Sequence, residues 1–141
     1  MKTFPKIAAV VAVAGAAVFA SVLPGSADVA AQSPSLGAVR VESPAILEAR
    51  GAAVRVSVTI VCPAGYPTSV NLTVTQRSGG GVATGSDYKS PVTCTGTAQT
   101  IELTPTANGE AFRRGTAFAS ASMYVSGPGY VTDDREIEIV R

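Results

Sequence analysis

Residues 53–62 read Ala-Val-Arg-Val-Ser-Val-Thr-Ile-Val-Cys and alternate apolar with polar side chains. Successive side chains of a β-strand point to opposite faces, so the pattern predicts a half-buried strand. Its polar positions are Arg55, Ser57 and Thr59. Its core-facing positions are Val54, Val56, Val58, Ile60 and Cys62.

Similar patterns elsewhere predict further strands. Residues 69–77, 116–126 and 135–141 alternate clearly. Shorter candidates are 38–41, interrupted at Pro44 and resuming at 45–47, then 82–84, and 92–94 continuing at 100–104. A bulge near Gly96 would bring Cys94 into phase with the apolar residues at 101 and 103. Residues 85–91 and 105–115 are predicted to be loops, the second with a turn at Asn108-Gly109. About seven strands separated by turn signals favour an antiparallel immunoglobulin-like β-sandwich.

The strand pattern of nearly all of residues 32–141 resembles immunoglobulin-like and fibronectin-type-III-like domains. It departs from true immunoglobulin domains because it has no tryptophan and its second cysteine precedes the penultimate strand. Two segments, Val-Ser-Val-Thr-Ile-Val-Cys-Pro-Ala-Gly-Tyr (56–66) and Arg-Arg-Gly-Thr-Ala-Phe-Ala-Ser-Ala-Ser (113–122), resemble small secreted actinobacterial proteins of unknown function. This resemblance implies no activity.

The first 31 residues have the three zones of a secretory signal. Lys2 and Lys6 precede an apolar run at 7–20, which is shorter than the roughly 20 residues that span a bilayer, and Pro24-Gly25 breaks it. We expect cleavage after Ala27 or Ala31, which leaves residues 32–141 as a single secreted, extracellular β-sandwich domain. No membrane insertion is expected after cleavage.

The net charge limits the partners that we expect, and the two cysteines indicate the redox compartment. The chain has eleven basic and ten acidic residues, and removing Lys2, Lys6 and Asp28 with the signal leaves nine of each. Because no excess positive charge remains, nucleic acid and anionic lipid are not expected as partners. Two cysteines in an exported chain favour one structural disulfide between Cys62 and Cys94.

The usual parts of an active site are missing from the sequence. There is no histidine and no Gly-x-Ser-x-Gly motif, so we expect no enzyme activity, no catalytic residues, no metal and no cofactor. Asp133-Asp134 lacks the spacing of a calcium loop and is interpreted as a solvated turn. Arg113-Arg114 is interpreted as a solvated loop, with a sugar acid or a carboxylate-rich protein surface as an alternative partner.

Four aromatic residues are the candidate binding residues. Phe118 and Tyr124 point outward if the alanine-rich side of residues 117–125 is buried, and small hydroxyls surround them. Tyr66 and Tyr130 belong to loops expected to meet at the disulfide end. We predict a secreted, non-catalytic binding module for an unknown protein or cell-wall partner, and the sequence does not indicate an oligomeric state.

Two other functions are compatible with this sequence. The first is small-ligand or glycan binding, since the architecture resembles neocarzinostatin-type apoproteins, although those carry two disulfides and this chain can form one. The second is protease inhibition by residues 105–115, ranked last because the predicted disulfide does not support that loop.

The signal peptide gives a first prediction. When the chain is expressed in a bacterial secretion host, N-terminal sequencing of the exported protein should begin at Asp28 or Gln32, because cleavage follows small residues. Retention of Met1 in the exported fraction would contradict the assignment.

Overall fold

The computed structural model describes residues 37–127 and 129–141; the predicted signal peptide lies outside this range. Apart from one 3-10 turn, η1 (Ala49–Gly51), the described elements are strands, and no helix among them is long and apolar enough to cross a membrane. The strands are β1 (Ala38–Val41), β2 (Ala45–Glu48), β3 (Ala53–Val61), β4 (Thr68–Ser78), β5 (Gly81–Val92), β6 (Gln99–Leu103), β7 (Thr106–Gly109), β8 (Gly115–Val125) and β9 (Gly129–Val140).

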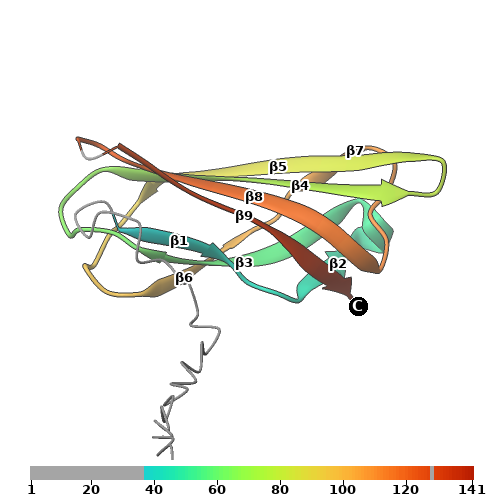
Figure 1. The fold of residues 1–141 in the computed structure, drawn as a ribbon, viewed down its shortest axis with the longest axis horizontal. Helices are drawn as coiled ribbons and strands as arrows, with labels where there is room; N and C mark the ends of the chain where they lie inside the picture. The colour runs from blue at the N-terminus through green and yellow to red at the C-terminus, as the bar shows by residue number, and fades with distance from the viewer. Residues whose placement is uncertain (1–36, 128) are drawn as a thin grey trace, which may run out of the picture.

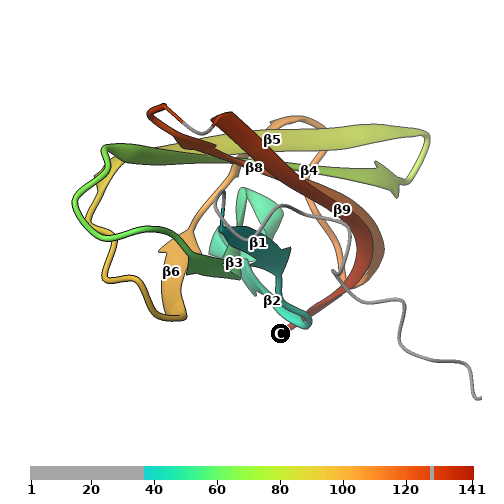
Figure 2. The same ribbon diagram turned by 60° about the vertical axis from the view of Figure 1, so that its left-hand side comes forward.

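The strands form one closed circuit. Hydrogen-bonded neighbours run from β3 through β2, β9, β8, β4, β5 and β7, and β7 returns to β3 where Ala53 pairs with Thr106. Strands β1 and β6 pair with the other half of β3. Figures 1 and 2 show β4, β5, β8 and β9 along one side and β1, β3 and β6 along the opposite side.

The predicted all-β class is therefore confirmed, but the described strands close into a seven-stranded barrel instead of separating clearly into two sheets. Most pairs are antiparallel, and β2 with β9 is a parallel pair. Nine strands are described where about seven were predicted.

The core confirms the alternation on which the prediction rested. The predicted inward residues of β3 are fully buried, and Cys62 is 1% exposed. The all-apolar side of β8 is also buried, and Ala119 and Ala121 leave no measurable exposure. Because alternate positions are sequestered, the other face of β8 carries its aromatic and hydroxyl side chains outward.

The predicted loop at 85–91 is wrong, and the predicted loop at 105–115 is wrong in part, since residues 110–114 do connect β7 to β8. Residues 85–91 belong to β5, and Asn108-Gly109 is no turn, because it lies in β7 and pairs with Thr84 and Ala83. The inward positions of β5 carry small residues because the backbone of the neighbouring strand β7 lies close to them. A Cβ on Gly85 would come within 2.6 Å of the Thr106 carbonyl oxygen. A strand that carries glycine at a buried position gives no apolar alternation to recognise.

The disulfide between Cys62 and Cys94 is confirmed, with Cα atoms 5.4 Å apart. Cys62 follows β3 and Cys94 precedes β6, and these strands are antiparallel neighbours, which brings the two cysteines to the same end. The predicted strand through Val92, Cys94 and residue 101 is instead two strands with a connection between them. The difference in phase therefore needs no bulge.

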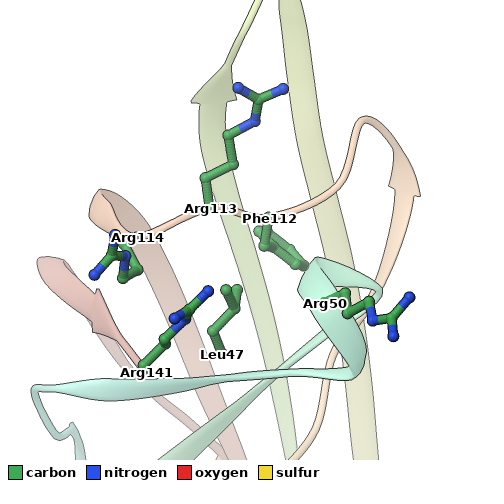
Figure 3. A pocket seen from close by; sticks show the side chains of 6 residues that line it. All are labelled: Leu47, Arg50, Phe112, Arg113, Arg114 and Arg141. Carbon is green, nitrogen blue, oxygen red and sulfur yellow. The ribbon is translucent and has the colours of Figure 1, made fainter.

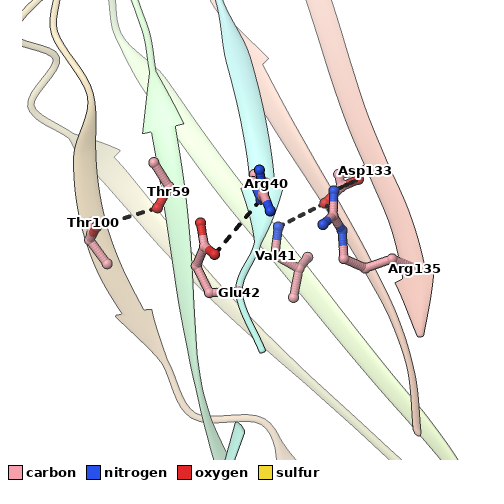
Figure 4. Close-up of polar contacts among 7 residues, drawn as sticks. All are labelled: Arg40, Val41, Glu42, Thr59, Thr100, Asp133 and Arg135. Carbon is pink, nitrogen blue, oxygen red and sulfur yellow. Dashed lines mark hydrogen bonds and ion pairs between the residues drawn. The ribbon is translucent and has the colours of Figure 1, made fainter. Parts of the chain in front are cut away.

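Asp133 does not lie in a solvated turn, as predicted, but within β9. Its carboxylate accepts a hydrogen bond from the Val41 amide at 2.7 Å and two from the Arg135 guanidinium at 2.7 and 2.9 Å (Figure 4). The side chain is 16% exposed. It thus satisfies an edge amide of β1 and ties that strand to β9.

The disulfide gives the second prediction. It links residues 32 positions apart, and the chain-entropy model assigns such a loop about 3.5 to 4 kcal/mol. Replacing both cysteines by alanine should lower the free energy of urea unfolding by about that amount at unchanged secondary structure. A loss below about 1 kcal/mol would contradict the entropic role of the bridge.

Candidate functional site

The outward face of β9, β8, β4 and β5 carries a neutral aromatic surface near the disulfide end. We name it the tyrosine face, and it consists of Ser69, Asn71, Tyr88, Ser122, Tyr124 and Tyr130. These six residues line a shallow hollow of about 330 Å³. None carries a formal charge at neutral pH, so the hollow offers aromatic rings, hydroxyls and one amide.

Strand register brings these residues together. Tyr124 of β8 lies opposite Tyr130 of β9, and their ring centroids are 4.9 Å apart at an interplanar angle of 46°. On the other side, Tyr124 lies opposite Ser69 of β4. One step along the sheet, Asn71 lies between Ser122 and Tyr88. The hollow is thus set by the ladders of four strands and needs no flexible loop to form it.

The three tyrosines are exposed, by 60% at Tyr88, 40% at Tyr124 and 70% at Tyr130. Tyrosine offers a broad rigid ring and a hydroxyl at a small cost in side-chain entropy, which suits it to contact surfaces. A second hollow of about 240 Å³ adjoins the first and shares Ser69, Tyr88 and Tyr124 with it. Together the two hollows extend the surface toward Pro67 and Pro91.

The sequence-predicted residues fall into three places. Tyr124 and Tyr130, predicted on different surfaces, pack against each other in the tyrosine face. Tyr66, 48% exposed, lies beside the hollow without lining it. The Ser126 amide donates to the Pro67 carbonyl at 2.9 Å, so the loop of Tyr66 does meet the turn before Tyr130.

Phe118 lies elsewhere. It is 48% exposed on the outward side of β8, but it pairs with Glu136 and Thr75, six residues from Tyr124. At about 3.4 Å per residue that separation is roughly 20 Å. Phe118 therefore does not contribute to the hollow, although it shares the strand and the face.

Tyr88 is the residue that sequence reasoning missed. It was placed in the predicted loop 85–91, whereas it extends from the middle of β5. A signal was available, because Val82, Thr84, Ser86 and Tyr88 alternate on the exposed side of that strand. The polar character of this series and the glycine on the opposite side concealed the period of two.

Hydrogen bonds lower the pKa of the Tyr88 hydroxyl. The hydroxyls of Ser90 and, to a smaller extent, Ser69 stabilise the phenolate and lower the pKa of Tyr88 below its usual value of 10.0. Desolvation opposes them and has the smallest effect. The phenol of Tyr88 is consequently polarised toward acting as a hydrogen-bond donor.

Among residues 37–127 and 129–141, no group of three or more histidine, cysteine, aspartate or glutamate side chains could hold a metal ion. The arrangement at the tyrosine face supports stacking and hydrogen bonding. Aromatic rings, hydroxyls and an amide of this kind can stack on the apolar faces of a ligand and bond its hydroxyl groups.

The third prediction concerns ionisation of Tyr88. Because its folded pKa lies below the unfolded value, the associated stability is present above pH 10.0 and is lost as the pH falls through the folded pKa. An ultraviolet titration of tyrosinate should show a phase below pH 10.0 that Tyr88→Phe removes and Ser90→Ala moves to higher pH. An unchanged curve for both variants would contradict the hydrogen bonds to Tyr88.

Comparisons with known proteins do not assign the chain to a family. No protein-family model matches its sequence, and no curated protein sequence is similar to it.

Proposed function

We propose that this protein is a secreted, non-catalytic binding module that attaches to a neutral, glycan-bearing cell-wall surface through the tyrosine face. The observation that carries the proposal is the uncharged hollow framed by three exposed tyrosines on four hydrogen-bonded strands. A sugar ring has apolar C–H faces and polar hydroxyl edges. Aromatic rings can contact the faces, while serine hydroxyls and the Asn71 amide can bond the edges.

The location of the charges supports a neutral ligand. The exposed carboxylates Asp134, Glu136 and Glu138 lie further along β9, away from the row of Tyr124 and Tyr130. A ligand confined to the hollow meets no formal charge among the six lining residues and so avoids burying a charge without a partner, which would be costly. The adjoining hollow, which shares Ser69, Tyr88 and Tyr124, lengthens the surface toward Pro67 and Pro91, and an extended surface suits a polymer chain better than a compact molecule.

The disulfide supports the secreted setting. Structural disulfides form and persist in oxidising compartments and are rare in the cytosol. The Cys62–Cys94 bridge fits an extracellular protein, and export itself remains part of the proposal together with the predicted signal.

Small-ligand binding is the second candidate. A hollow of about 330 Å³ falls at the lower end of the range of small-molecule sites, roughly 300 to 1,000 Å³. A soluble ligand that binds only the native state would raise the melting temperature by mass action. This readout separates the two candidates, since an insoluble glycan is detected by co-sedimentation.

The fourth prediction tests the tyrosine face by co-sedimentation. The oxidised protein should pellet with purified cell-wall sacculi or insoluble polysaccharide. Tyr124→Ser and Tyr130→Ser should each weaken binding about tenfold, because each removes an aromatic contact worth roughly 1 to 1.5 kcal/mol. The bound fraction is measured in pellet and supernatant over a range of polysaccharide concentrations.

Phe118→Ser is the matched control. It removes an aromatic ring of similar exposure from the same strand and face, but outside the hollow, so binding should be unchanged. Loss of binding in Phe118→Ser with retention in the tyrosine variants would move the site along β8. A wild-type protein that stays in the supernatant with every wall material would exclude wall attachment for those materials.

A further inference from the structure

Another hollow, which shares no residue with the tyrosine face, lies at the far end of the barrel. We name it the arginine hollow, and it has a volume of about 380 Å³ and is lined by Leu47, Arg50, Phe112, Arg113, Arg114 and Arg141. Arg114 immediately precedes β8, and Tyr124 lies near the other end of that strand. Ten residues of strand separate the two sites by roughly 30 Å.

Positive charge is concentrated in this hollow. Four of the eleven basic residues of the chain line it, and they come from three separate segments. Figure 3 shows Arg114 and Arg141 near each other on one side of Leu47 and Phe112, with Arg50 on the other side and the Arg113 guanidinium extending away from both. A chain whose acidic and basic residues nearly balance therefore has a local excess of positive potential at one end.

No carboxylate in the described part of the chain neutralises these guanidinium groups. The ion pairs among those residues use Arg40, Arg55 and Arg135. Glu48, the carboxylate next to Leu47 in the chain, pairs with Arg55 at 3.0 Å. Arg50, Arg113, Arg114 and Arg141 thus have no ion-pair partner among the described residues, and Arg114 and Arg141, which lie on the same side of the hollow, can act together on an external anion.

The backbone that carries Arg113 is fixed from inside the barrel. Gln76, 4% exposed, accepts a hydrogen bond from the Arg113 amide at 2.8 Å and donates one to the Arg113 carbonyl at 2.8 Å. Ser78, also buried, donates to the Ala111 carbonyl at 2.8 Å. Buried polar side chains that bond the backbone of a loop pre-organise that loop, which lowers the entropic cost of binding.

Phe112 and η1 secure the opposite wall. Phe112 is 1% exposed, and its amide donates to the Gly51 carbonyl at 2.8 Å. Ala49 and Arg50 have left-handed φ angles of 47° and 56°. Such conformations cost non-glycine residues roughly 1 to 3 kcal/mol and persist where the surroundings enforce them. Here the contact with Phe112 enforces the turn, which holds Arg50 at the rim.

The chemistry of the hollow points to one class of ligand. Guanidinium groups bond the oxygen pairs of carboxylates and phosphates through two parallel N–H donors. A single exposed ion pair contributes little, so useful affinity needs several arginines to act on one ligand. We propose that the arginine hollow binds a ligand bearing at least two oxyanion groups, phosphate or carboxylate.

The fifth prediction tests this site by isothermal titration calorimetry of the oxidised protein with pyrophosphate and, separately, with citrate at constant ionic strength. At least one probe should bind, and added sodium chloride should weaken the binding because exposed charges are screened. Binding of pyrophosphate alone assigns a phosphate ligand, binding of citrate alone a carboxylate ligand, and binding of both a general oxyanion site. Absence of binding to both would overturn the proposal.

Variants locate the site. Arg114→Gln should weaken binding about tenfold, as expected for loss of a charge-assisted hydrogen bond, and Arg141→Gln should add to that loss. Arg40→Gln is the matched control, because it removes the same charge from β1, outside the hollow. Equal weakening in Arg40→Gln and Arg114→Gln would reduce the effect to net charge and overturn the site. Tyr124→Ser should bind both probes normally, which separates this test from that of the tyrosine face.

Discussion

Backbone pairing along both edges of β3 is the constraint on which the barrel depends. β1 and β2 pair with one edge of this nine-residue strand, and β6 and β7 pair with the other. β2 and β7 pair with the first part of β3 and continue the barrel. β1 and β6 pair with the second part of β3 and form a three-stranded region with it. The buried valines of β3 serve both halves, because alternate residues point to the same interior along its whole length.

The sequence predicts what alternation alone can report. Alternation identifies the buried face of β3 from Val54 to the following Cys62, of β4 from Val70 to Val74, and of β8 at its alanines. All of these faces are buried. Closure of the barrel could not be predicted, because it depends on β7. Its four residues, Thr-Ala-Asn-Gly, contain a typical turn pair and no apolar series. They are extended because neighbouring strands offer hydrogen bonds on both sides, a tertiary effect that local preference does not reveal.

The candidate sites, like the fold, could be predicted from the sequence only in part. Tyr124 could be assigned to an exposed surface once the buried side of β8 was recognised. Its neighbour Tyr130 could not be placed beside it, because their contact follows from the register of β8 with β9. Tyr88 was concealed by the glycine on the inner side of β5, where β7 takes the space of a side chain. The arginine hollow gathers three segments distant in sequence, so Arg113-Arg114 alone looked like a solvated loop.

The inward face of β4 links the core to both sites. Its central residues Val70, Leu72 and Val74 are apolar, but it begins with Thr68 and ends with Gln76 and Ser78, all buried. Each of these polar residues bonds the backbone of a connection that covers one end of the barrel. Thr68 donates to the Tyr66 carbonyl at 3.1 Å, beside the tyrosine face, whereas Gln76 and Ser78 hold the loop of the arginine hollow.

Buried polar side chains at the ends of an otherwise apolar strand face would leave donors and acceptors unpaired unless loop backbone entered the interior. No buried side-chain polar atom among the described residues is left without a partner. The polar residues at the two ends of β4 therefore mark the positions where loop backbone enters the ends of the barrel. Both candidate sites lie at those ends. In a barrel of this kind, the residues that close the core also position the loops beside the exposed residues of the two candidate sites.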